Sequence, residues 1–161
     1  MSRNIVVVIL AAGLGTRMKS GLVKVLHLVG GQPMIIYPLS VAERLNPERI
    51  LVIVGFQGDR IRETCLKFRD IEAKSSLEFV LQEKPLGTGH AMMQVEPHLK
   101  GSEGNILVLC GDVPLLREQT LWRLLDKHIE TGAAISLLTV EVPDPTGYGR
   151  IIRDRNGVIS R

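Results

Sequence analysis

Short apolar runs rich in β-branched residues recur along this chain, and they constrain its fold more than any other feature. The first run, "IVVVIL", is apolar at every position, so no polar face alternates with the apolar one. A strand that is covered on both faces has this pattern, which is typical of parallel sheets. Similar runs lie at residues 50–54, 77–81, 106–109 and 135–142. The pattern predicts a mainly parallel sheet.

Segments with helical periodicity separate these runs. Residues 33–45 carry apolar side chains on one stripe before Asn46-Pro47 ends it, and residues 59–68 and 116–129 are further candidates. Alternating strands and helices predict an α/β, doubly wound sheet with right-handed crossovers. At the end of the chain, "GRIIRDRNGVISR" predicts a hairpin that turns at Asn156-Gly157.

Composition excludes several classes of protein. With 161 residues, 45% of them apolar and 23% charged, the chain fits one folded domain rather than a disordered segment. The net charge of +3 is not gathered into a basic run, so we expect no nucleic-acid partner and favour a small acidic ligand. Cys65 and Cys110 form no metal or redox motif and are interpreted as reduced core thiols. Reduced thiols indicate a cytoplasmic protein, and no segment is long and apolar enough for a membrane span.

The first apolar run leads into the glycine-rich stretch "LAAGLGTRMKSGLVK". A P-loop and a dinucleotide fingerprint both fail there, because Met18 stands where each needs a glycine. A third interpretation uses all the residues present: Gly13 and Gly15 let backbone N–H groups approach a triphosphate, and Arg17 and Lys24 supply positive charge. A plain strand-to-helix loop with solvated basic residues remains the alternative.

Four motifs together resemble one family. The glycine stretch is similar to the G-x-G-T-R…P-K signature of sugar-phosphate nucleotidyltransferases. "VLQEKPLGTGHAM", "LCGDVPLL" and "DPTGYGRI" follow in the order found in the uridylyltransferase domains of bifunctional enzymes that make UDP-N-acetylglucosamine. The resemblance implies a cytoplasmic Mg²⁺-dependent transferase of peptidoglycan and cell-wall biogenesis. Its substrates would be UTP and N-acetylglucosamine 1-phosphate, with residues 1–161 belonging to the nucleotidyltransferase domain.

The resemblance also implies roles for individual residues. Arg17 and Lys24 would be catalytic, Asp112 would hold Mg²⁺, and Gly149 would face the sugar. The nucleotide and sugar would further contact Leu10, Ala11, Ala12, Gly13, Lys24, Gln82, Gly87, Thr88, Cys110, Gly111 and Asp112.

The residue chemistry agrees with parts of this assignment. The Gln82 amide suits the imide edge of uracil, because it both donates and accepts. Asp112 follows an apolar run, and its carboxylate suits Mg²⁺ that is held mainly by phosphates and water. Gly87 and Thr88 fit a base contact, a helix start capped by Thr88, or both. Each of these residues also has a plain turn or surface interpretation.

The sequence departs from the family pattern at two motif positions. The usual proline before the signature lysine is Val23, and Cys110 stands where a tyrosine often precedes Gly-Asp.

The resemblance further places sugar-binding residues and a second metal ligand beyond Arg161, and the trimerising acetyltransferase domain as well. We therefore expect UTP to bind weakly and turnover to be at least about 10³-fold below a full-length enzyme. Other sugar-phosphate nucleotidyltransferases, a binding module without turnover and an inert fragment stay open, and the oligomeric state stays unassigned.

Overall fold

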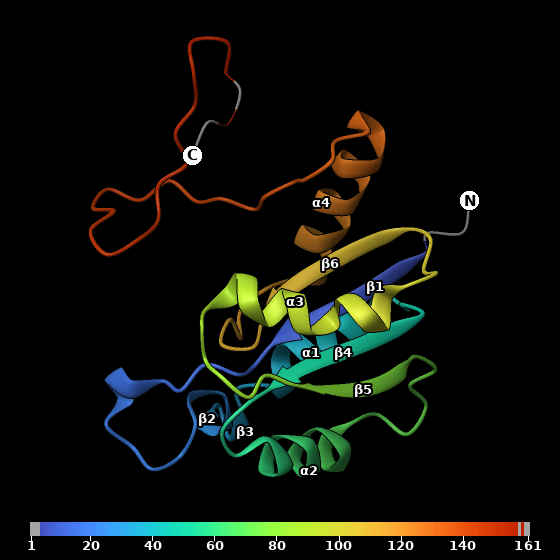
Figure 1. Ribbon diagram of the computed structural model, residues 1–161, viewed down its shortest axis with the longest axis vertical. Helices are drawn as coiled ribbons and strands as arrows, with labels where there is room; N and C mark the ends of the chain where they lie inside the picture. The colour runs from blue at the N-terminus through green and yellow to red at the C-terminus, as the bar shows by residue number, and fades with distance from the viewer. Residues whose placement is uncertain (1–3, 158, 160–161) are drawn as a thin grey trace. The chain divides into compact units, whose positions relative to one another are not determined.

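The computed structural model describes residues 4–157 and 159, and the chain divides into two units, Met1–Trp122 and Arg123–Arg161. The first unit is built on a four-stranded parallel sheet with the strand order β5-β4-β1-β6 (Figure 1). Its strands are β1 (Ile5–Leu10), β4 (Arg49–Val54), β5 (Ser76–Leu81) and β6 (Asn105–Cys110). The α/β fold with a parallel sheet is therefore confirmed.

Helices cover both faces of this sheet, as the apolar strand pattern requires. Helix α3 (Thr88–Leu99) lies on one face, where Ala91 and Val95 pack with Val6, Val8 and other strand residues in one buried cluster. Helices α1 (Ile36–Arg44) and α2 (Gly58–Phe68) contact each other, and α1 contacts β1 on the opposite face (Figure 1). Because β1 is central and covered on both sides, Val7, Val8 and Ile9 are completely buried.

The predicted helix over residues 33–45 begins later than expected. Gln32–Pro33 is instead strand β3, which pairs antiparallel with β2 (Leu28–Val29) in a small separate sheet. Gly30 and Gly31 both have positive φ, the backbone geometry that a tight two-residue hairpin needs and that glycine adopts without strain. Before this hairpin lie two short 3₁₀ turns, η1 (Thr16–Met18) and η2 (Lys24–Leu26).

The second unit contains most of helix α4, which spans Glu118–Thr131 and begins in the first unit. The strand predicted at residues 135–142 is wrong: these residues are described, and none is in a strand. Ile135 and Val140 are 77% and 74% exposed. A strand needs a hydrogen-bonded neighbour as well as apolar side chains, and the described residues give this segment none.

The predicted C-terminal hairpin is observed only as one antiparallel bridge between Arg153 and Ile159. The turn is present, since Gly157 has a positive φ and its N–H donates to Asp154 O at 3.0 Å. Val158, the residue that follows the predicted turn, lies outside the described residues.

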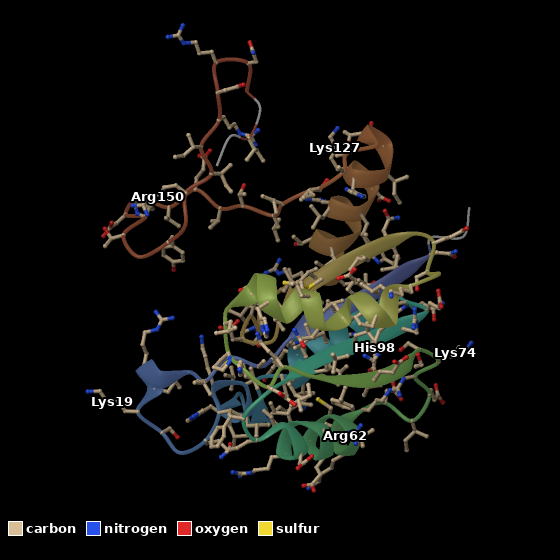
Figure 2. The ribbon with its side chains drawn as sticks, viewed as in Figure 1. Lys19, Arg62, Lys74, His98, Lys127 and Arg150 are labelled. Carbon is tan, nitrogen blue, oxygen red and sulfur yellow. The ribbon has the colours of Figure 1, made fainter. Side chains whose placement is uncertain are left out.

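Several charged side chains of the first unit lie on its surface. Lys19, Arg62 and Lys74 are exposed and come from separate parts of the chain (Figure 2). Arg62 extends over the ring of Phe79, with its guanidinium carbon 5.1 Å from the ring centroid. Across the described residues, no helix combines the length and apolar character that a membrane span requires.

Candidate nucleotide-binding site

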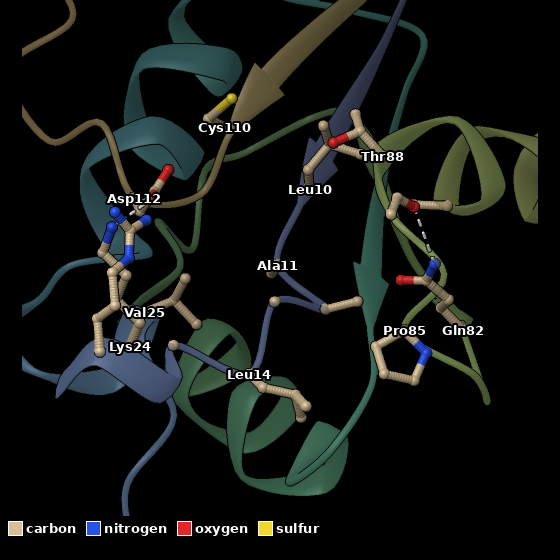
Figure 3. A pocket seen from close by; sticks show the side chains of 16 residues that line it. Leu10, Ala11, Leu14, Lys24, Val25, Gln82, Pro85, Thr88, Cys110 and Asp112 are labelled. Atoms are coloured by element: carbon tan, nitrogen blue, oxygen red, sulfur yellow. Dashed lines mark hydrogen bonds and ion pairs between the residues drawn. The ribbon is translucent and has the colours of Figure 1, made fainter. Parts of the chain in front are cut away.

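The candidate site lies at the carboxyl ends of the parallel strands. The chain passes from β1 to β4 and β5 on one side, then returns to place β6 on the other side of β1. Ligands of open α/β sheets bind where the order reverses in this way, outside the carboxyl ends of the strands. A pocket of about 510 Å³ opens there (Figure 3). It is lined by Leu10, Ala11, Ala12, Gly13, Leu14, Gly15, Arg17, Lys24, Val25, Gln82, Pro85, Gly87, Thr88, Ala91, Cys110 and Asp112.

The glycine-rich loop forms one wall of the pocket. Gly15 has a φ of +62°, and a Cβ atom added there would lie only 2.7 Å from Lys24 Cβ. A side chain at this position would therefore push the loop away from Lys24. A Cβ atom on Gly13 would meet nothing within 4 Å, which leaves open space at that point of the loop. Arg17 is exposed and also lines the pocket.

Lys24 and Asp112 form an ion pair at one side of the pocket. Lys24 Nζ donates to Asp112 Oδ2 at 2.6 Å, although the two residues are 88 positions apart in the sequence. Their side chains are 34% and 38% exposed, so water and salt can screen the pair. Figure 3 shows both side chains on the same side of the opening, below Cys110. The basic loop and the acidic strand end thus meet.

Gly111 holds Asp112 in place without lining the pocket. Its N–H donates to Leu10 O at 2.9 Å, which extends the pairing of β1 and β6 by one residue. A Cβ atom on Gly111 would lie 2.9 Å from Leu10 O and 3.0 Å from Ile35 Cδ1. The close approach of the two strand ends therefore requires a glycine here.

The two cysteines lie in different environments. Cys65 is buried, as predicted, and burial followed by the charge of Glu43 raises the pKa of its thiol to about 12. The prediction that Cys110 is a core thiol is wrong, because Cys110 is exposed and lines the pocket. Partial burial and the charge of Asp112 raise the pKa of Cys110, and Lys24 opposes them. As the last residue of an edge strand, Cys110 has one side uncovered.

Gln82 lies on the other side of the pocket, directly after β5. Its side chain is buried, with 5% of the residue exposed, and Nε2 donates to Gly87 O at 3.2 Å. Figure 3 shows the amide oxygen turned toward the open centre of the pocket. Gly87 precedes α3 with a φ of +97°, and no side chain caps this helix. The expectation that Thr88 caps α3 is therefore wrong, since Thr88 is already the first helical residue and lines the pocket instead.

Two residues that support the site were not predicted from the sequence to belong to it. Gln57 accepts from the N–H of Val23 through Oε1 at 3.1 Å and donates through Nε2 to Gly21 O at 2.8 Å. It thus fixes the segment that leads into Lys24. The ring of His90 lies 2.9 Å from Gln82 Nε2. The "LGTGHA" motif contained a signal for His90, whereas Gln57 lies outside every motif.

The structure gathers most of the predicted site residues but not all of them. Apart from Gly111, the pocket lining omits Gly149, which is exposed in the second unit with nothing within 4 Å of an added Cβ. Within the described part of the chain, no three or more His, Cys, Asp or Glu residues are grouped to hold a metal ion. Asp112 offers one hard carboxylate beside the cationic loop. That donor suits a magnesium ion that brings phosphate and water as its other ligands.

A pocket at the reversal point of a parallel sheet, lined by a glycine loop, two basic side chains and one carboxylate, defines a nucleotide-binding α/β protein. The model of the MobA-like NTP transferase domain matches residues 7–155. The chain belongs to this nucleotidyltransferase family. The resemblance to sugar-phosphate nucleotidyltransferases predicted from the motifs is confirmed.

Curated relatives show which members of this family the chain is similar to. The chain is 51% identical over 157 residues to the bifunctional protein GlmU of a Cyanothece species, covering 98% of this chain and 33% of that protein. It is 45% identical over 158 residues to GlmU of Geobacter metallireducens, covering 98% and 32% respectively. The chain thus spans about a third of the length of these curated relatives.

Solved structures agree on the fold. HddC from Yersinia pseudotuberculosis, in a complex with GMP-PN, superposes with a TM-score of 0.65 at 27% identity, covering 94% of this chain and 65% of that one. The 4-diphosphocytidyl-2C-methyl-D-erythritol synthase from Anaerococcus prevotii gives a TM-score of 0.61 at 18% identity, covering 78% and 50%. The second likeness supports the fold alone.

Proposed function

We propose that this chain carries the uridylyltransferase function of a UDP-N-acetylglucosamine-synthesising enzyme. It would transfer a uridylyl group from UTP to N-acetylglucosamine 1-phosphate in the cytoplasm and release pyrophosphate. One observation carries the proposal: a single pocket combines an oriented amide on one side with a cationic loop and a carboxylate on the other. The identity to GlmU proteins over nearly the whole chain supports a nucleotidyltransferase, and the motif resemblance to uridylyltransferase domains supports the choice of UTP and this sugar phosphate.

Gln82, Gly87 and Thr88 form the side of the pocket that would receive the base. The Gln82 oxygen faces the opening and can accept a hydrogen bond from the N3–H of uracil. Cytosine has a lone pair at that ring position, and this lone pair would be repelled by the same oxygen. The pocket chemistry therefore favours UTP over CTP.

The glycine loop with Arg17 and Lys24 forms the side that would receive the triphosphate. Residues 10–13 line the path between the two sides, and the open space at Gly13 lets backbone N–H groups approach phosphate oxygens. Asp112, together with phosphate oxygens and water, would hold Mg²⁺. When bound, the ion would supply charge neutralisation at the phosphates. Cys110 and Gly111 would position Asp112, and Gly149 would contact the sugar.

The proposed reaction is an in-line displacement at the α-phosphorus of UTP. A phosphate oxygen of the sugar phosphate forms the new O–P bond, and the bond between the α-phosphorus and the pyrophosphate oxygen breaks. The attacking group is already an anion, so no general base is required. Lys24 and Arg17 contribute by neutralising the charge that moves onto the departing pyrophosphate, and the pocket contributes by alignment.

A panel of nucleotides and sugar phosphates tests the proposal. Binding of UTP, dTTP, CTP, ATP and GTP to the protein is measured by calorimetry with Mg²⁺, and pyrophosphate release is followed with each sugar 1-phosphate. UTP should bind at least about fivefold more tightly than CTP, since one mispaired hydrogen-bonding group costs roughly 1–3 kcal/mol. Equal affinity for UTP and CTP contradicts the uracil assignment. Faster pyrophosphate release with a different sugar phosphate contradicts the choice of acceptor.

A further inference from the structure

We propose that His90 is a positioning residue that sets base selectivity, because it fixes which end of the Gln82 amide faces the pocket. The inference rests on the proposed function, in which Gln82 meets the uracil ring. His90 is the third residue of α3 and is only partly exposed, and its Nδ1 atom lies 2.9 Å from Gln82 Nε2.

The orientation of the Gln82 amide follows from its neighbours. Gly87 O already accepts from the N–H of Ala91 at 3.0 Å, so it is an acceptor in the first turn of α3. The Gln82 atom that lies 3.2 Å from this oxygen must therefore be the nitrogen, since an amide oxygen there would be repelled. The same nitrogen contacts His90 Nδ1, which must accept the second N–H.

Both protons of the Gln82 nitrogen are thus engaged, one by Gly87 O and one by His90 Nδ1. No hydrogen bond to Gln82 Oε1 occurs among the residues that the structure describes, and Figure 3 shows this oxygen on the pocket side. A side chain that usually both donates and accepts has become an acceptor toward the ligand. An acceptor pairs with the N3–H of uracil and opposes the N3 lone pair of cytosine.

The tautomer of His90 follows from the same network. With Nδ1 accepting, the ring proton is on Nε2. Gln94 lies on that side, and its Nε2 donates to His90 O at 3.1 Å. The 3.4 Å contact between Gln94 Nε2 and His90 Nε2 then joins two donors and is not a hydrogen bond. Selectivity therefore depends on the Nδ1 side of the ring.

The test compares UTP and CTP binding for the wild-type protein and three variants, by calorimetry with Mg²⁺. His90→Phe keeps a flat ring but removes the acceptor, so the amide is held by Gly87 O alone and the ratio of UTP to CTP affinity should fall by about 3- to 10-fold. His90→Asn offers an oxygen near the Nδ1 position and should restore most of the ratio. Gln94→Ala, on the other side of the ring, is the matched control and should leave the ratio unchanged. Melting temperatures of all variants are recorded.

Each outcome decides a different question. A wild-type protein that binds UTP and CTP equally, or neither, overturns the proposed function together with this inference. A selective wild type whose ratio persists in folded His90→Phe overturns the role of His90 alone. If His90→Phe does not fold, His90→Asn decides: retained selectivity there supports the Nδ1 acceptor. If selectivity falls equally in His90→Asn and Gln94→Ala, the effect is general packing and the inference is wrong.

Discussion

The ion pair between Lys24 and Asp112 predicts opposite effects of one substitution in the presence and absence of Mg²⁺. Without ligand, Asp112 neutralises Lys24 at 2.6 Å. A triphosphate that uses Lys24 must compete with this carboxylate, and an ion that uses Asp112 must displace the ammonium group. Asp112→Asn removes the negative charge from the pocket and keeps the size of the side chain.

The magnitude follows from the exposure of the pair. With side chains 34% and 38% exposed, the interaction is partly screened and contributes no more than about 1 kcal/mol. In EDTA, Asp112→Asn should therefore bind UTP up to about fivefold more tightly than the wild type, because Lys24 is free for phosphate and a repulsive carboxylate is gone. Adding Mg²⁺ should increase the affinity for UTP in both proteins. This increase should be at least about tenfold smaller in Asp112→Asn than in the wild type, because the charged protein ligand of the ion has become neutral.

Calorimetry of UTP binding with EDTA and across a Mg²⁺ titration measures both effects. Glu72→Gln is the control, since it removes one negative charge from an exposed turn before β5, at the other edge of the sheet. Weaker UTP binding by Asp112→Asn in EDTA would show that Lys24 needs its partner to be aimed at the phosphates. An unchanged Mg²⁺ titration would remove Asp112 from the metal site. Either result refutes the corresponding half of the reasoning.

Three further predictions concern single side chains. Arg17→Ala should lower kcat for pyrophosphate release by about 10²-fold or more with little change in melting temperature, whereas Lys74→Ala on an exposed loop should change neither. Gly111→Ala should lower the free energy of unfolding by about 1–3 kcal/mol, measured in urea, because its Cβ would lie 2.9 Å from a backbone oxygen. Gly13→Ala, with open space around the added atom, should change it by less than about 0.5 kcal/mol. The raised pKa of Cys65, about 12, means that the folded thiol keeps its proton when the unfolded one loses it. Stability should therefore fall above about pH 9, by up to about 1.4 kcal/mol per pH unit, and urea unfolding of Cys65→Ala should lack this contribution.

The parallel sheet could be predicted from the sequence, because strands that are buried on both faces are apolar at nearly every position. The run at residues 5–10 is apolar throughout because β1 is central, and it was predicted to the residue. The run at residues 135–142 is also rich in β-branched and apolar residues, although it contains Ser136, Thr139 and Glu141, and it is not a strand. Strand propensity states which surface a segment can cover, whereas strand formation also requires a neighbour to pair with. Pairing is a tertiary property, so strand predictions from apolar runs were correct at residues 5–10 and wrong at residues 135–142.

The candidate site was likewise only partly predictable from the sequence. Asp112 could be placed at the carboxyl edge of the sheet from the sequence, because it follows a predicted strand. The family resemblance implied that Lys24 belongs to the same site. The contacts that orient the side chains in the pocket could not be predicted from the sequence. His90 meets Gln82 only because the chain turns at Gly87 and starts a helix there, and an amide contact at one ring nitrogen has no sequence signature. The exposure of Cys110 likewise depends on which strand lies at the edge of the sheet.

Val23 shows how a departure from a family motif can be compensated by a distant residue. Its φ of −60° is close to the value that the usual proline would fix. A proline has no N–H, however, and Val23 uses that group to donate to Gln57 Oε1 at 3.1 Å, while the other end of the same amide donates to Gly21 O. Gln57 directly precedes α2 and has a φ of +58°. The constraint that a ring would impose locally is therefore imposed here by α2, and the direction of Lys24 depends on how that helix begins.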